Sequence, residues 1–198
     1  MKIQTGRHPY RQLIKIGQEQ GRRPQPDDIR QILCNSWGIG ELAEVMSIAI
    51  SEPRLMELEE VVQAEVNGVA AYPDALEAVE LLAAHGYAIA VCSNLASPYG
   101  AAIRRCFPAL DAYALSYEIG AIKPERAVYE ACCSSLSCEP DRMVMIGDSP
   151  SCDCDGPLAV GIQGYLLERV RGAGDFADLM TFAEWFLSLG STSAPFQK

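Results

Sequence analysis

Two carboxylates follow a short apolar run in the second half of the chain. Residues 143–146 are Met-Val-Met-Ile and run into Gly147, Asp148 and Ser149, with Asp153 close behind. A short apolar run predicts a buried strand, and Gly147 lets the chain turn at its end. In α/β proteins, ligands bind at the carboxyl ends of such strands. Carboxylates with no histidine beside them suit Mg²⁺, which takes one or two carboxylates plus substrate phosphate. We therefore expect Asp148 and Asp153 to hold Mg²⁺.

Groups that bind anions follow two other predicted strand ends. The predicted strand 87–92 ends in Ser93 and Asn94, whose hydroxyl, amide and backbone N–H groups can hold phosphate oxygens. Lys123 directly precedes Pro124, which suits the first turn of a helix, where bound anions are favoured. Each signal alone is weak, because Ser-Asn commonly caps a turn and a lone lysine is commonly solvated. Their order along the chain, at successive strand ends, indicates one phosphate site.

Composition excludes several classes of partner. The chain has 198 residues and a formal net charge of -10, without a basic run, which argues against nucleic acid or an anionic membrane as partner. The N-terminus has no apolar secretory segment, and no apolar stretch is long enough to span a bilayer. We therefore expect a cytoplasmic protein, with a monomer and a homodimer both open.

The cysteines are numerous but do not form a metal motif. There are eight, without any CxxC pair, and in a chain without an export signal they are most simply reduced thiols. Cys152 and Cys154 flank Asp153, but two ligands do not make a closed zinc site.

The pattern of the elements changes near residue 70. Residues 1–70 carry apolar residues at helical spacing without a strand pattern, and helices are expected at 10–20, 28–33, 40–50 and 53–66. From residue 71 onward, helices and strands alternate, which predicts an α/β domain with a parallel sheet covered on both faces. The expected helices are 73–84, 97–106, 124–136, 155–160 and 176–189, and the expected strands are 87–92, 112–117, 143–146 and 163–167. The tail 191–198 is expected to be flexible.

Three segments together resemble a known family. Val91-Cys92-Ser93-Asn94, the segment 120–129 (GAIKPERAVY) and the segment 145–161 (MIGDSPSCDCDGPLAVG) resemble motifs two, three and four of the haloacid dehalogenase-like (HAD) hydrolase superfamily. The segment 72–87 is similar to the helix that returns from a helical cap inserted after the first motif. The resemblance implies a Rossmann-like parallel sheet in a core at 71–190, preceded by a helical cap at 1–70.

The resemblance also implies roles for the site residues. Ser93 would hold the transferring phosphoryl group with Asn94 beside it, and Lys123 would offset negative charge. Asp148 would bind Mg²⁺, and Asp153 would support the metal or its waters. The implied activity is a Mg²⁺-dependent phosphatase that acts on a small phosphorylated metabolite through an aspartyl-phosphate, with the cap closing over the site.

Two other functions remain open. A 2-haloacid dehalogenase also resembles the pattern, but such enzymes need no metal and typically carry Ser-Ser-Asn where this chain has Gly147-Asp148-Ser149. The metal-type aspartate favours the phosphatase. The third possibility is a non-catalytic protein that binds phosphorylated ligands or acts through contacts alone.

The first motif of the family has no counterpart in this chain. In the family it is a buried strand ending in Asp-x-Asp, whose first aspartate is the nucleophile, and it lies mid-sheet between the strands that lead to Ser93 and Asp148. Asp148 belongs to the segment that resembles motif four, and none of Asp27, Asp28, Asp74 and Asp111 follows such a strand. Its absence would leave backbone groups unpaired, at about 1–3 kcal/mol each.

Two explanations of the missing motif stay open. Residues 1–10 resemble the stretch just after the nucleophile loop. We expect a shortened product of a longer gene, inactive alone, because the other motifs are intact. The alternative is a genuine variant without a nucleophile.

Overall fold

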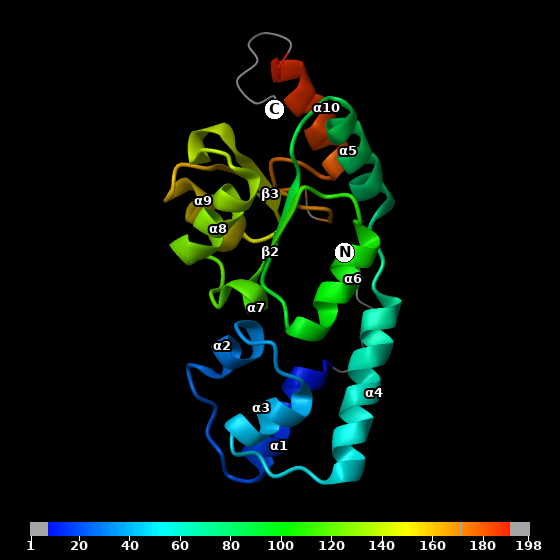
Figure 1. Ribbon diagram of the computed structural model, residues 1–198, viewed down its shortest axis with the longest axis vertical. Coiled ribbons are helices and arrows are strands. Elements are labelled where there is room, and N and C mark those ends of the chain that lie inside the picture. The colour runs from blue at the N-terminus through cyan, green and yellow to red at the C-terminus, as the bar shows by residue number, and fades with distance from the viewer. Residues whose placement is uncertain (1–7, 171, 191–198) are drawn as a thin grey trace. The chain divides into compact units, whose positions relative to one another are not determined.

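The computed structural model describes residues 8–170 and 172–190 (Figure 1). The expected flexible tail at 191–198 therefore lies outside the described residues. The chain divides into two compact units. The first unit consists of Met1–Ala70, Asn94–Pro108 and Ser116–Ala121, and the second of Ala71–Ser93, Ala109–Leu115 and Ile122–Lys198. Two later segments thus join the residues that the sequence assigns to a cap at 1–70.

The first unit is helical throughout its named elements. These are α1 (Pro9–Glu19), α2 (Asp28–Leu33), α3 (Ile39–Val45), α4 (Glu52–Gly68), the short turn η1 (Ser97–Tyr99), α6 (Gly100–Cys106) and α7 (Ser116–Ile119). The expected helix at 40–50 ends early, at Val45, because Ser47 adopts a left-handed backbone with φ of 54°. The other expected helices of this unit form within a few residues of their expected ends.

The core of the first unit is built from the apolar faces of its longer helices. Leu13 of α1, Leu42 of α3 and Leu58 of α4 are fully buried. The loop after α1 is fixed by an ion pair, in which the Arg22 guanidinium donates to the Asp28 carboxylate at 2.8 Å. Arg22 Nε also donates to the carbonyl of Met46 at 2.8 Å, so one side chain ties the loop to both α2 and the end of α3.

The second unit alternates strands with helices, as the sequence predicts. Its strands are β1 (Ala90–Ser93), β2 (Ala112–Leu115), β3 (Val144–Gly147) and β4 (Gln163–Leu166). Its helices and helical turns are α5 (Pro73–Ala84), α8 (Arg126–Leu136), η2 (Pro140–Arg142), η3 (Pro150–Asp155), α9 (Gly156–Leu158) and α10 (Leu179–Gly190). The chain therefore has the α/β class expected from the alternation.

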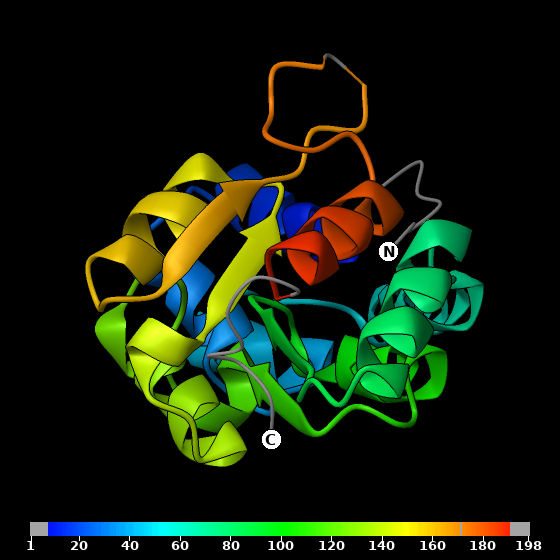
Figure 2. The same ribbon diagram turned by 90° about the horizontal axis from the view of Figure 1, so that it is seen from above.

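The strands are parallel, but they form two separate pairs. β1 pairs with β2, with Ser93 opposite Leu115, and β3 pairs with β4, with Gly147 opposite Leu166. Figure 2 shows the β3–β4 pair in yellow and orange. Between residues 8 and 190, leaving aside residue 171, no strand joins β1 to β3. The parallel sheet is thus interrupted between β1 and β3, where the resemblance places the strand for which the sequence shows no counterpart.

Helices cover the two strand pairs within the second unit. α8 packs on β1 and β2, and α10 packs along α5 (Figures 1 and 2). Aromatic rings fill the space between β4 and α10: the ring centroids of Tyr165 and Trp185 are 5.1 Å apart, and those of Phe176 and Phe182 5.3 Å. Phe176 forms a bridge with Leu167, so the last helix begins at Leu179 and not at the expected residue 176. In the described part of the chain, no helix is sufficiently long and apolar to cross a bilayer.

Candidate phosphate and metal site

Lys123 holds the central position among the predicted site residues. It lies in the connection between α7 and α8, and only 10% of its side chain is exposed. Its ammonium donates to the carbonyl of Cys92 in β1 at 3.0 Å and to Oδ1 of Asp153 at 2.6 Å. A charged group that is this buried needs charged and hydrogen-bonding partners, and both are present. The lysine thus links the end of β1 to the loop that follows β3.

Backbone groups around Asp153 fix the position of its side chain. Its side chain is only 4% exposed, and its second oxygen, Oδ2, accepts a hydrogen bond from the N–H of Ser149 at 2.9 Å. A Cβ on Gly147 would overlap the Asp153 carboxylate, and one on Gly164 would overlap the backbone at Asp153 and Cys154. Both glycines are therefore required by the close approach of η3 to β3 and β4.

The other predicted residues lie beside this pair. Ser93 is the last residue of β1 and follows Cys92, whose carbonyl accepts from Lys123. Asp148 follows the last residue of β3 and is exposed to solvent, one position before the Ser149 N–H that contacts Asp153. The structure thus gathers Ser93, Lys123, Asp148 and Asp153 around the carboxyl ends of β1 and β3. Asn94 belongs to a segment of the first unit.

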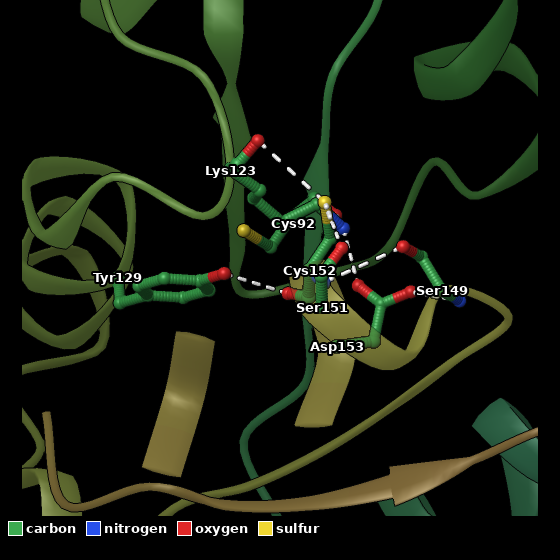
Figure 3. A network of polar contacts seen from close by, with 7 residues as sticks. All are labelled: Cys92, Lys123, Tyr129, Ser149, Ser151, Cys152 and Asp153. Atoms are coloured by element: carbon green, nitrogen blue, oxygen red, sulfur yellow. Dashed lines mark hydrogen bonds and ion pairs between the residues drawn. The ribbon is translucent and has the colours of Figure 1, made fainter. Parts of the chain in front are cut away.

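A second set of contacts fixes η3, the wide helical turn that carries Asp153 (Figure 3). The Tyr129 hydroxyl of α8 donates to the carbonyl of Cys152 at 2.6 Å. Gly156 makes room for this contact, because a Cβ there would overlap the hydroxyl. Cys152 in turn donates weakly from its thiol to the carbonyl of Lys123 at 3.6 Å. The sequence singles out Tyr129 only through the resemblance, and its position near the start of the helix that follows Lys123-Pro124 is the signal for this role.

The thiol of Cys92 lies next to the same charges. Burial raises the pKa of this thiol to about 11, while the ammonium of Lys123 opposes the rise and the Asp153 carboxylate adds to it. Cys92 is therefore protonated at neutral pH and takes part in the site through its backbone carbonyl rather than as a nucleophile.

The carboxylates at this site could supply only a few of the oxygen ligands of a Mg²⁺ ion, so water or phosphate would supply the others. Among residues 8–170 and 172–190 there is no group of three or more histidine, cysteine or carboxylate side chains placed to enclose a metal ion. Asp148 offers an exposed carboxylate, whereas both oxygens of Asp153 already accept hydrogen bonds. This is the chemistry of Mg²⁺ held by one or two carboxylates, with water and phosphate as the remaining ligands.

Comparison of the sequence with curated proteins finds a phosphatase that is similar to this chain. A phosphoglycolate phosphatase of Rhodospirillum rubrum is 30% identical over 132 residues, which cover 60% of this chain and 54% of the relative. The chain therefore spans about half the length of that curated relative.

Solved structures share the fold at lower sequence identity. A HAD phosphatase from Thermococcus onnurineus matches with a TM-score of 0.62 and 18% identity, covering 90% of this chain and 87% of that one. A HAD family enzyme from Bacteroides thetaiotaomicron, in complex with magnesium and inorganic phosphate, matches with a TM-score of 0.57 and 19% identity over 85% of this chain and 89% of its own. An L-2-haloacid dehalogenase matches with a TM-score of 0.58 and 17% identity over 91% and 80%.

The family itself is settled by a match across most of the chain. The model of the haloacid dehalogenase-like hydrolases matches residues 7–161, which contain Ser93, Lys123, Asp148 and Asp153. This chain belongs to the haloacid dehalogenase-like hydrolase family.

Proposed function

We propose that this chain provides the phosphate- and magnesium-binding part of a phosphatase site for a small phosphorylated metabolite. The observation that carries the proposal is the position of the Lys123 ammonium, which is buried between the Cys92 carbonyl and the Asp153 carboxylate at the ends of β1 and β3. A lysine fixed at strand ends binds phosphate as a point charge, and Ser93 adds a hydroxyl next to it.

Asp148 is the residue proposed to bind Mg²⁺ directly. Its exposed carboxylate can replace one water of a hydrated Mg²⁺, and the ion would offset the charge of a phosphate and hold it near Lys123. Asp153 would act differently, because its oxygens accept from Lys123 and from the Ser149 N–H. It would fix the lysine and the loop that carries Asp148, which refines the expectation that it supports the metal or its waters.

The covalent step is proposed to require a further carboxylate. An aspartyl-phosphate needs an ionised aspartate in line with the phosphorus atom. In the described part of the chain, Asp153 is committed to Lys123, and Asp148 is assigned to the metal. The site as described would therefore bind phosphate and Mg²⁺ more effectively than it turns over esters.

The same observation favours a second candidate, a non-catalytic protein that binds phosphorylated ligands. It would keep Lys123, Ser93 and Asp148 for binding and have no use for a nucleophile. The dehalogenase is disfavoured, because Asp148 suits a metal that such enzymes do not need.

Calorimetric titration of inorganic phosphate into the chain, with and without Mg²⁺, tests the proposal. We expect phosphate binding that Mg²⁺ strengthens, and loss of that enhancement in Asp148→Asn. Asp141→Asn is the matched control, since Asp141 is an exposed aspartate in η2 and should leave binding unchanged. If Mg²⁺ has no effect on phosphate binding, or if both variants behave alike, the metal assignment is wrong.

Turnover distinguishes the two candidate functions. Phosphate binding together with hydrolysis of a small phosphate ester in a protein that also carries the nucleophile would support the phosphatase. Binding without hydrolysis in such a protein would support the non-catalytic candidate. The phosphoglycolate phosphatase relative makes a small phosphorylated acid the first ester to test.

A further inference from the structure

Helix α8 ends in a turn that brings two cysteines together. Ser137 adopts a left-handed backbone with φ of 50°, and its N–H donates to the carbonyl of Ser134 at 3.1 Å. The N–H of Cys138 donates to the carbonyl of Cys133 at 3.0 Å. This pair of bonds defines a Schellman motif, in which the first and last residues of the turn commonly make a side-chain contact. Here both of those positions are cysteines.

The hydrogen bond limits the distance between the two residues. Standard geometry places the amide nitrogen about 1.5 Å and the carbonyl oxygen about 2.4 Å from their Cα atoms. With the 3.0 Å bond between them, the Cα atoms of Cys133 and Cys138 can be at most about 7 Å apart, and a bent path makes the separation smaller. Disulfides span Cα separations of about 4.4–6.8 Å, so the backbone geometry permits a bridge.

The two cysteines border the same cavity at the surface of the molecule. Cys133 and Cys138 line the same open surface cavity of about 490 Å³ between α8 and η2. Cys133 is 8% exposed and packs against Tyr129 and Ile162. Cys138 is more exposed, and its thiol makes weak contacts with the carbonyls of Glu139, just before η2, and of Arg142 in η2. Burial raises the pKa of the Cys133 thiol, and the neighbouring Cys138 adds to the rise. Cys138 is therefore the more accessible attacking group, and Cys133 is placed to react second.

We infer that Cys133 and Cys138 form a reversible redox pair that a low-molecular-weight disulfide oxidises. The Cys138 thiolate attacks one sulfur of the small disulfide, which forms a mixed disulfide and releases one thiol. Cys133 then loses its proton and attacks the Cys138 sulfur, which closes the protein disulfide and releases the second thiol. Two protein thiols are oxidised, and one small disulfide is reduced to two thiols. This inference is independent of the proposed function.

Oxidation of the whole chain with glutathione disulfide tests the pair. After free thiols are blocked, the protein is digested with chymotrypsin, which cleaves after Leu136 and so separates Cys133 from Cys138. We expect the two peptides to stay joined without reductant and to separate with it. Mapping that finds Cys138 joined to another cysteine or to a second chain, or Cys138 left as a stable mixed disulfide, would overturn the inference.

Single substitutions assign the order of the two steps. Cys133→Ser should trap the glutathione adduct on Cys138, and Cys138→Ser should abolish the cross-link. Cys132→Ser is the matched control, because Cys132 is the adjacent cysteine on α8, and its cross-linking rate should stay within about twofold of the unsubstituted chain. Loss of the cross-link in this control would instead assign the bridge to Cys132. The unsubstituted chain decides the main question even if a variant fails to fold.

Discussion

The Lys123 ammonium lies 2.6 Å from Oδ1 of Asp153, and both side chains are almost completely buried. The same carboxylate accepts from the N–H of Ser149, while the same ammonium donates to the Cys92 carbonyl. One ion pair therefore connects the end of β1, the segment before α8 and the loop after β3. It positions the groups that we assign to phosphate and metal binding.

Breaking this pair from one side should destabilise the second unit. Lys123→Met leaves the Asp153 carboxylate buried without its charged partner, which typically costs about 3–5 kcal/mol. Urea unfolding followed by Trp185 fluorescence in a Trp37→Phe background reports on this unit, because Trp185 belongs to it and Trp37 to the other. Lys15→Met is the control, as the Lys15 side chain is 73% exposed.

A double substitution separates the net contribution of the Lys123–Asp153 ion pair to stability from the cost of leaving one charge buried without a partner. Lys123→Met combined with Asp153→Leu removes both charges, so it should recover part of the stability that Lys123→Met loses. Asp153→Leu alone completes the comparison: a loss in the double variant equal to the sum of the two single losses would contradict a direct coupling between the two side chains.

Gly147 should tolerate no side chain. The methyl group of Gly147→Ala would overlap the Asp153 carboxylate, so either the carboxylate or β3 must shift. We expect a loss of about 1–3 kcal/mol in unfolding free energy and weaker phosphate binding, because Lys123 loses its fixed partner. The measurements are urea unfolding and phosphate titration.

Gly68→Ala is the control for the glycine. Gly68 lies at the end of α4, and a Cβ there meets no atom within 4 Å, so it should be neutral or slightly stabilising. Unchanged phosphate affinity in Gly147→Ala would show that the position of Asp153 does not govern the site.

The Arg22–Asp28 pair should make the first unit sensitive to acid. The hydrogen bond from the Arg22 guanidinium holds the pKa of Asp28 below its usual range, although burial opposes this. The unfolded chain then takes up the proton at higher pH than the folded one. The stabilisation is complete above the ordinary aspartate pKa of about 3.9 and is lost as the pH falls through the lower folded value.

Asp28→Asn should therefore lower the unfolding free energy only at pH values above the range in which folded Asp28 takes up its proton. We expect a loss of about 1–3 kcal/mol at pH 7 that diminishes below about pH 4, measured by urea unfolding with Trp37 fluorescence in a Trp185→Phe background. Asp27→Asn should have little effect, since the Asp27 side chain is 59% exposed. A penalty for Asp28→Asn that is constant down to pH 2 would rule out the pair as the cause.

This chain alone should hydrolyse para-nitrophenyl phosphate very slowly, with or without Mg²⁺. The reason is that none of the carboxylates placed at the described site is left to act as a nucleophile. Release of para-nitrophenolate is the measurement, with Asp148→Asn as the comparison. Clear Mg²⁺-dependent turnover that Asp148→Asn abolishes would show that a carboxylate of this chain performs the covalent step.

Much of the fold follows from local sequence signals. Helix α5 begins at Pro73 and ends at Ala84, as expected from the proline and from Gly86 just after it. The expected strand at 112–117 stops at Leu115 instead, because Ser116 begins α7 and its hydroxyl accepts from the N–H of Leu95. That contact joins residues 21 positions apart, so no local pattern could predict it.

The sequence predicts the places of the candidate site residues at the strand ends, but not the contacts that these residues make. Strand ends and residue types pointed to Ser93, Lys123, Asp148 and Asp153, because parallel strands bring their carboxyl ends to one edge. The two Asp153 oxygens accept hydrogen bonds from Lys123 and from the N–H of Ser149, and these contacts depend on the close approach of η3 to β3. Side-chain geometry of this kind is set by tertiary packing, which periodicity does not encode.

The interruption between β1 and β3 has a consequence for the behaviour of the protein in solution. Among the residues described, each of these strands has one side that no other strand covers, although the Cys92 carbonyl of β1 accepts a hydrogen bond from Lys123. Such an open border is a template for pairing with a further extended chain. Concentrating the protein should therefore favour self-association through added strands, and an extended peptide that competes for this border should keep the molecules apart.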